Sequence, residues 1–357
     1  MYRNIAATVA DVLQKLISRI RRNKHESQQF VFVTNQGSNN ISQFKVAVNG
    51  GLLPIVPATI ASGTTPVFIA FTPSGKYAYV ANQGGNSISQ YRINEHGSLE
   101  VIAAPAAAGT SPVDIAIDPS GRYAYVANSS SNEVSQYSIG EDGKLAAMTP
   151  ATVETRLIPV AVKVDPAGKY VYVVNNSSND ISQYLISGNG SLVAMSPSTI
   201  VAGKAPRAIA IEPSGKFAYV VNRTSGDVQQ YEITPSGCLA EISSPVAAGK
   251  HPIAINISPS GKHAYVVNQN GNSISQFAIA ANGCLAPLTP ANVASLVTPV
   301  AIAISRSGRY AYASNILSND ISQYAIDEQG RLTAIPVNAW GDATVKAEMS
   351  PRCIITV

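Results

Sequence analysis

The pattern of apolar and polar positions in this chain repeats at a fixed interval. A run rich in Tyr, Val and Ala that ends in Asn occurs seven times, about every 47 residues. The copies are 30–35, 77–82, 123–128, 170–175, 217–222, 263–268 and 310–315. Because only strand-like segments lie within the interval, the pattern predicts one supersecondary unit that stacks on copies of itself.

The unit at 112–158 predicts four antiparallel strands. Pro112–Ile117 is rich in β-branched residues and predicts a first strand, and an Asp-Pro-Ser-Gly turn leads to a second strand at Tyr123–Ala127. Strict alternation at Val134–Ile139 predicts a half-exposed third strand. We expect a short, weak fourth strand at Leu145–Met148, followed by a long Ala/Thr/Pro connection. Four strands in such a unit are typical of a β-propeller blade.

The two ends of the chain predict that the ring closes. The first unit begins at Phe30 with its second strand, and residues 351–357 are similar to the first strand at 206–211. We therefore expect an all-β, seven-bladed propeller at 29–357, in which 351–357 complete blade 1 and close the ring three-plus-one. An open solenoid is the alternative, but it would end in polar caps and not in a complementary half-repeat.

Residues 1–28 predict a short amphipathic basic helix and a linker. The apolar positions that share one face of this helix are Ile5, Val9, Val12, Leu13, Leu16, Ile17 and Ile20. The helix is expected to dock on the propeller, self-associate, or bind a partner or membrane surface. No clear signal peptide is present, so a cytoplasmic location is the default expectation and an envelope location stays open.

Charge and cysteine content exclude several function classes. Six of the 25 basic and two of the 21 acidic residues lie in 1–28, which leaves 19 of each in the propeller and no basic stripe for nucleic acid. No apolar run is long enough for a transmembrane segment. The three cysteines do not form a disulfide framework, and no ligand spacing predicts a metal site or a cofactor.

The repeat Pro-x-x-Ile-Ala-x-x-Pro-Ser-Gly-Lys/Arg-Tyr-Ala-Tyr-Val-x-Asn resembles the seven-bladed lactonase (6-phosphogluconolactonase-like) family across 30–357. It is also similar to the propellers with a Tyr-Val-Thr-Asn repeat. The resemblance implies a Pro-Arg-His motif, a second His and a Glu. Here Arg207 is kept, whereas the His and Glu positions hold Ala208, Asp114 and Arg223. Because lactone opening needs a base and a group that stabilises the oxyanion, Arg207 and Asp114 are the remaining catalytic candidates and an enzymatic function is uncertain.

Polar residues replace apolar ones at several inner-strand positions, and we expect them to line the central tunnel. These residues are Asp114, Lys163, Arg207, Asn256 and Arg352. Two interpretations stay open. Either Asp114 pairs with Lys163 or waters fill the tunnel, or Lys163, Arg207 and Arg352 hold a small anionic ligand.

Carboxylates at three turns have a simpler expected role. Asp118, Asp165 and Glu212 each precede a Pro-containing turn between the first two strands. A carboxylate at this position can accept hydrogen bonds from backbone amides. We therefore expect these residues to fix the turns and not to act as acids or bases.

The Asn/Ser/Gly-rich loops that follow the strand-ending asparagines are expected to form one face of the ring. These asparagines are Asn35, Asn82, Asn128, Asn175, Asn222, Asn268 and Asn315. Such loops suit recognition of a protein or glycan partner. The first hypothesis is therefore an interaction scaffold that presents this loop face and the tunnel mouth. The alternative is a lactone hydrolase that acts on a sugar-acid lactone, with Arg207 as the anion or oxyanion binder.

Overall fold

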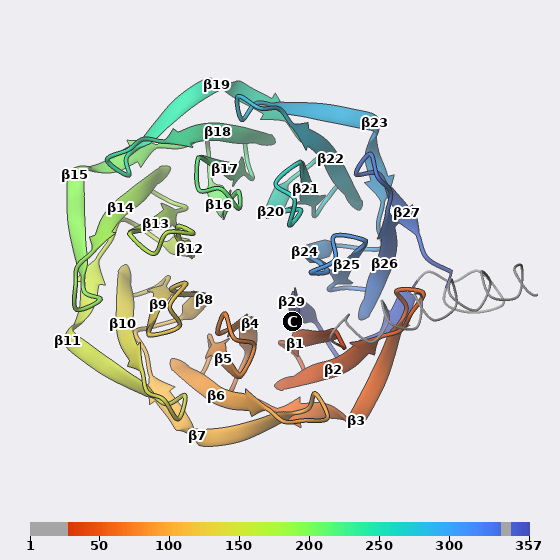
Figure 1. The fold of residues 1–357 in the computed structure, drawn as a ribbon, viewed down its shortest axis with the longest axis horizontal. Helices are drawn as coiled ribbons and strands as arrows, with labels where there is room; N and C mark the ends of the chain where they lie inside the picture. Colours follow the sequence, from red (N-terminus) through yellow and green to blue (C-terminus); the bar gives the residue numbers. More distant parts are fainter. Residues whose placement is uncertain (1–27, 337–343) are drawn as a thin grey trace, which may run out of the picture.

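The computed structural model describes residues 28–336 and 344–357, and the helix expected in 1–28 falls on residues outside this part except for Gln28. Seven β-sheets surround a central axis in sequence order (Figure 1). The predicted seven-bladed propeller with four antiparallel strands per blade is confirmed. Within these residues, no helix has both the length and the apolar character needed to span a bilayer.

Each blade runs from an innermost strand at the tunnel to an outermost strand at the rim. The innermost strands of blades 1 to 7 are β29 (Pro351–Thr356), β4 (Pro66–Phe71), β8 (Pro112–Ile117), β12 (Pro159–Val164), β16 (Pro206–Ile211), β20 (Pro252–Ile257) and β24 (Pro299–Ile304). The second strands are β1 (Phe30–Asn35), β5 (Tyr77–Asn82), β9 (Tyr123–Asn128), β13 (Tyr170–Asn175), β17 (Phe217–Asn222), β21 (His263–Asn268) and β25 (Tyr310–Asn315). The third strands are β2 (Asn40–Val46), β6 (Ser87–Ile93), β10 (Glu133–Ile139), β14 (Asp180–Ile186), β18 (Asp227–Ile233), β22 (Ser273–Ile279) and β26 (Asp320–Ile326). The outer strands are β3 (Leu52–Ala61), β7 (Leu99–Ala107), β11 (Leu145–Glu154), β15 (Leu192–Val201), β19 (Leu239–Ala247), β23 (Leu285–Ala294) and, in blade 7, β27 (Leu332–Ala334) with β28 (Thr344–Lys346).

The ring closes through the C-terminal strand, as the two chain ends predicted. β29 pairs antiparallel with β1, with Ile354 opposite Val33. Phe30 and Val357 exchange two backbone hydrogen bonds, of 3.1 and 3.0 Å. Ile354 is 4% exposed and packs between blades 7 and 1. The last strand therefore contributes both hydrogen bonds and buried apolar surface to the seam.

The outer strands correct one expectation, because they are longer than the sequence suggested. β11 continues to Glu154 and does not end at Met148. A bulge interrupts its register with β10, and the Gln136 side chain enters the bulge, where Nε2 donates to the Pro150 carbonyl over 3.0 Å. This side-chain contact gives the bulged backbone a partner, so the strand resumes beyond a proline that would normally end it.

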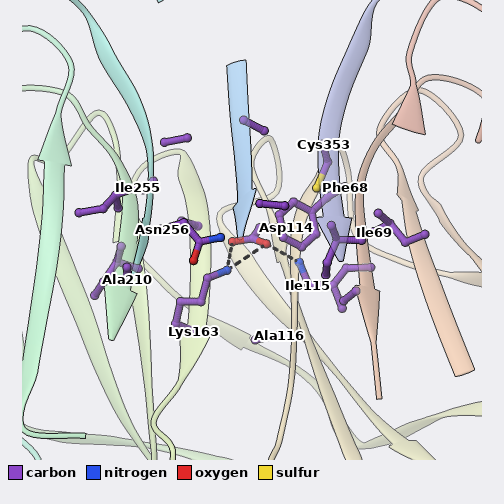
Figure 2. Close-up of a pocket in the computed structure, with 18 of the residues that line it drawn as sticks. Phe68, Ile69, Asp114, Ile115, Ala116, Lys163, Ala210, Ile255, Asn256 and Cys353 are labelled. Carbon is purple, nitrogen blue, oxygen red and sulfur yellow. Dashed lines mark hydrogen bonds and ion pairs between the residues drawn. The ribbon is translucent and has the colours of Figure 1, made fainter. Parts of the chain in front are cut away.

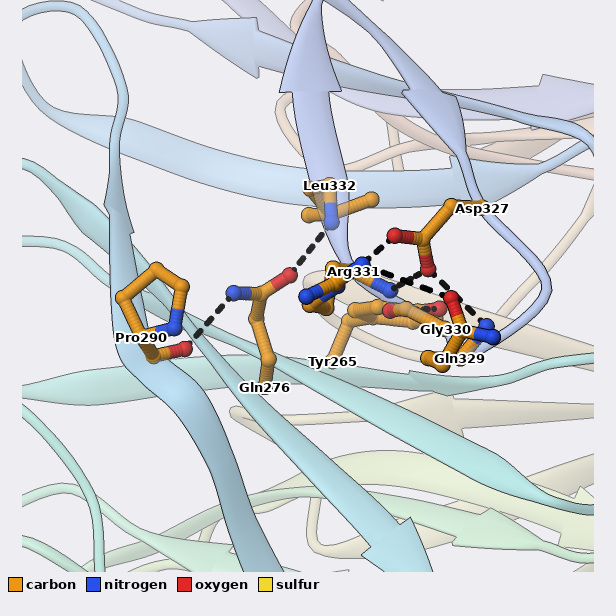
Figure 3. Close-up of polar contacts among 8 residues, drawn as sticks. All are labelled: Tyr265, Gln276, Pro290, Asp327, Gln329, Gly330, Arg331 and Leu332. Atoms are coloured by element: carbon orange, nitrogen blue, oxygen red, sulfur yellow. Dashed lines mark hydrogen bonds and ion pairs between the residues drawn. The ribbon is translucent and has the colours of Figure 1, made fainter.

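Neighbouring blades interlock through an aromatic residue and a glycine. In blade 6, the Tyr265 hydroxyl donates to the Gly330 carbonyl of blade 7 over 2.7 Å (Figure 3). His263 occupies the position that is Tyr or Phe in the other blades, and its ring covers the same glycine. A Cβ at Gly330 would lie 2.2 Å from the His263 ring, and φ there is +81°, so only glycine fits. His263 thus has a packing role.

The tunnel cavity and the loop face

The innermost strands line a central cavity of about 630 Å³. All five polar residues that the sequence assigned to the tunnel belong to its lining: Asp114, Lys163, Arg207, Asn256 and Arg352. They come from strands β8, β12, β16, β20 and β29. Only the propeller closure brings these positions, far apart in the chain, to one site. Their individual contacts then show which of them remain available to a ligand.

Asp114 is 4% exposed and fully engaged by hydrogen bonds. Its Oδ1 accepts from the amide of Ile115, and its Oδ2 accepts from the amide of Val162 on the next blade, both at 2.9 Å. Lys163 Nζ lies 3.1 Å from Oδ2, and Figure 2 shows the two side chains pointing toward each other. Burial raises the pKa of the Asp114 carboxyl, while the Lys163 ammonium and the two amides oppose this shift. The Asp114–Lys163 ion pair, which was part of the first interpretation of the tunnel, is therefore present.

Lys163 is held by more than its carboxylate partner. Nζ also donates to the Val162 carbonyl over 3.1 Å and lies 5.2 Å from the centre of the Phe68 ring. These contacts satisfy the ammonium without a ligand. Lys163 is therefore not a free anion binder in this structure.

Asn256 joins two blades in the same way as Asp114. Its Oδ1 accepts from the amide of Ile257 at 2.8 Å, and its Nδ2 donates to the Ile302 carbonyl of blade 7 at 3.1 Å. These bonds link β20 to β24, as Asp114 links β8 to β12. We therefore assign Asn256 to the packing of the inner strands.

Arg207 and Arg352 differ from the other three residues. Both are half-buried, and neither guanidinium has a side-chain hydrogen bond or ion pair within the residues that the structure describes. Burial, together with the like charges of Arg352 and Arg223, lowers the pKa of Arg207 to about 10. Burial also lowers the pKa of Arg352. Arg207 still carries its proton at neutral pH, so the cavity holds uncompensated positive charge.

The strand-ending asparagines are buried, so they lie beneath the loops that are expected to form the loop face. All seven are 0% exposed. Asn128 Nδ2 donates to Ser135 Oγ at 2.8 Å, and Asn175 Nδ2 donates to Asp180 and Ser182 of its own blade. These buried hydrogen bonds fix the start of each loop from within its blade. Any partner of the face would contact the exposed residues that follow them.

The turn carboxylates have the expected structural role. Asp118 accepts from the amides of Ser120, Arg122 and Tyr123. Glu212 does the same in blade 5 and also accepts from the Ser214 hydroxyl. Each carboxylate therefore fixes its turn on the face opposite the loops.

Two cavity residues were missed by the sequence analysis. Phe68 and Cys353 are the third residues of their inner strands, where blade 3 has Asp114. Aligning that position across all seven blades would have shown them. Burial raises the pKa of Cys353 to about 12, so its thiol stays protonated at neutral pH and is a poor nucleophile.

Comparison with known proteins decides the family. The model of the lactonase family, described as a seven-bladed β-propeller, matches residues 18–96, 53–155, 144–253 and 246–346. The chain belongs to the lactonase family. A search of curated protein sequences found no match to this lactonase-family chain.

Solved structures of similar shape support this fold assignment. A candidate 6-phosphogluconolactonase from Bacteroides fragilis has a TM-score of 0.81 at 22% identity, and the match covers 93% of this chain and 98% of that one. A second candidate, from Bacteroides uniformis, has a TM-score of 0.81 at 23% identity, with coverage of 93% and 100%. The periplasmic gluconolactonase of Pseudomonas aeruginosa has a TM-score of 0.79 at 21% identity, with coverage of 93% and 99%. At these identities the likeness shows the fold alone.

Proposed function

We propose that this protein hydrolyses the lactone of a sugar acid at the central cavity. The observation that carries the proposal is the unpaired, half-buried guanidinium of Arg207 in the cavity lining. Membership of the lactonase family supports it. The scaffold interpretation does not explain the family match as directly.

Arg207 would stabilise the charge that develops during ring opening. Water adds to the lactone carbonyl carbon, the carbonyl oxygen becomes an oxyanion, and the ring C–O bond then breaks. The ring oxygen takes a proton and the product is a hydroxy acid. A cation in a partly desolvated cavity stabilises such an oxyanion more strongly than it does the neutral carbonyl.

Arg352 and Asp114 have supporting roles in this proposal. Arg352 lines the same cavity, and its charge suits the anionic group of a substituted sugar acid. Asp114 is the only Asp or Glu among the residues that line the cavity. Its carboxylate oxygens, however, already accept hydrogen bonds from Lys163 and from two backbone amides. We therefore assign Asp114 to positioning, and the attacking water releases its proton to solvent.

A non-catalytic scaffold is the second candidate, favoured by one specific observation. At the positions where the family resemblance implies His, His and Glu, this chain has Ala208, an Asp114 bound to Lys163, and an exposed Arg223. None of these supplies a free base. The scaffold would bind a small anion or a partner at the same mouth without turnover.

A turnover assay separates the two candidates. Hydrolysis of a panel of aldonolactones, including gluconolactone and 6-phosphogluconolactone, is measured for the wild type and Arg207→Ala against the spontaneous rate. Enzyme-dependent hydrolysis that Arg207→Ala loses supports the hydrolase. No acceleration on any lactone, together with saturable binding of gluconate or 6-phosphogluconate, supports the scaffold.

A further inference from the structure

In the described loops and connections of the loop face, the basic residues lie between blades 3 and 6. The loops after the strand-ending asparagines and the connections between blades contain mostly Gln, Gly, Ser, Asn, Thr and Ala. Their basic residues are Arg156, Lys204, Arg223, Lys250 and His251, and their one acidic residue is Glu348 in the connection to blade 1. Arg156 pairs with Asp180 over 3.4 Å. The remaining basic residues therefore cluster in one sector of the ring.

A hollow of about 430 Å³ lies within this sector. Arg223 and Thr224 line it from the loop of blade 5, Lys250 and His251 from the connection to blade 6, and Asn270 from the next loop. A volume of this size lies within the range of roughly 300–1,000 Å³ that is usual for small-molecule pockets. The basic side chains on its lining are exposed, so ligand access needs no rearrangement.

The charge of this basic hollow is not neutralised from within. Arg223, Lys250 and Lys204 make no side-chain ion pair in the part of the chain that the structure describes. Asp227 follows the blade 5 loop, and its Oδ1 accepts from Asn222 Nδ2 at 2.7 Å. Arg223 and Lys250 line the hollow, and Lys204 adjoins it, because its carbonyl accepts from the Thr224 amide at 3.1 Å. An anionic ligand would supply the missing charge.

The neutral residues around the cations indicate the class of ligand. Thr224 and Asn270 offer hydroxyl and amide groups, which suit the hydroxyls of a sugar. The lining contains no Phe, Tyr or Trp on which a nucleic-acid base could stack. We propose that the basic hollow binds an acidic oligosaccharide, with uronate carboxylates on Arg223 and Lys250 and ring hydroxyls on Thr224 and Asn270.

This site goes beyond the proposed lactone chemistry and stands without it. Arg223 follows Asn222, which pairs with Pro206, the residue directly before Arg207 of the cavity lining. An oligosaccharide bound in the hollow would thus lie near the loop-face end of the cavity. Binding in the hollow requires no hydrolysis, so an inactive protein could still bind the oligosaccharide.

Calorimetric titration of the full chain tests the proposal. The probes are tetragalacturonate, the neutral maltotetraose, and a thymidine oligonucleotide of the same charge as the tetragalacturonate. The protein variants are Arg223→Ala/Lys250→Ala and the control Lys216→Ala, which removes an exposed charge from the opposite face of blade 5. We expect tetragalacturonate to bind most tightly, to weaken as salt rises, and to lose at least about tenfold in affinity in the double variant only.

Three results would overturn this assignment. They are equal affinity for maltotetraose, equal affinity for the oligonucleotide, and unchanged tetragalacturonate affinity in the double variant. Because all substituted side chains are exposed, the variants should fold, and unchanged melting temperatures check this. The lactone assay on the same samples is read separately, so failure of one proposal does not conceal failure of the other.

Discussion

Gln276 of blade 6 accepts a hydrogen bond from the backbone amide of Leu332 in blade 7, over 2.6 Å (Figure 3). Its Nε2 simultaneously donates to the Pro290 carbonyl in the outer strand of its own blade, at 3.0 Å. The side chain is 0% exposed. One glutamine therefore stabilises the bulge of its own blade and joins this blade to the next blade. Equivalent contacts are made by Gln43, Gln90, Gln136, Gln183 and Gln230.

We expect Gln276→Ala to destabilise the propeller without changing the cavity. The substitution leaves a buried amide and a carbonyl without partners, at about 1–3 kcal/mol each. Chemical denaturation measures the loss. The control Gln329→Ala removes an exposed amide that contacts only Arg331 in the same turn, and it should change the free energy of unfolding by less than about 0.5 kcal/mol. Equal effects of the two substitutions would contradict the role of Gln276.

Removing residues 351–357 should destabilise the whole ring. The deletion exposes the hydrogen-bonding edge of β1 and removes Ile354, Ile355 and Val357 from the seam. At about 1.5–3 kcal/mol for each buried aliphatic side chain, the loss approaches the total stability of an ordinary domain. Thermal melting and size-exclusion chromatography should show early unfolding or aggregation. An unchanged melting temperature would refute the seam, and Ile354→Ala provides a milder test, with an expected loss of about 2–5 kcal/mol.

Substitutions of Asp114 should separate stability from anion binding. Asp114→Ala leaves the amides of Ile115 and Val162 without partners, so it should cost about 1–3 kcal/mol for each. Asp114→Asn keeps an acceptor and should cost less. Because the Asp114 charge acts on Arg207, its removal should strengthen gluconate binding by roughly fivefold. Weaker gluconate binding by a folded Asp114→Asn protein would show that Asp114 contacts the ligand instead.

Glu212 should make stability depend on acid pH. Burial alone would raise the pKa of its carboxyl, but hydrogen bonds from Ser214, Lys216 and Phe217 outweigh burial and hold the pKa below its ordinary value of 4.5. A lowered folded-state pKa contributes stability above the unfolded-state value, and this contribution is lost as pH falls through the folded-state pKa. Glu212→Gln should thus be less stable than the wild type at pH 7, and the gap should narrow below about pH 4. A gap that stays constant from pH 7 to pH 3 would contradict this account.

Most of the fold could be predicted from the sequence repeat, because each blade uses the same residues for the same contacts. Tyr265 and Gly330 are examples, since their equivalents recur at the repeat interval. The length of β11 could not be predicted, because Thr-Pro usually ends a strand and the compensating contact comes from Gln136 on another strand. The Asp114–Lys163 pair was foreseen as one of two alternatives. The sequence alone could not show that Asp114 and Lys163 bind each other whereas the guanidinium of Arg207 has no partner among the described residues. The three-dimensional structure was needed to distinguish them.

The central claim is that Arg207 stabilises the oxyanion of a bound lactone, and steady-state kinetics of Arg207→Ala test it most directly. On the best substrate of the lactone panel, we expect kcat to fall about 100- to 1,000-fold, as when an oxyanion donor is removed. KM should change less, whereas Arg352→Ala should mainly raise KM. A wild-type rate no greater than spontaneous hydrolysis, or an Arg207→Ala protein with unchanged kcat, would contradict the claim.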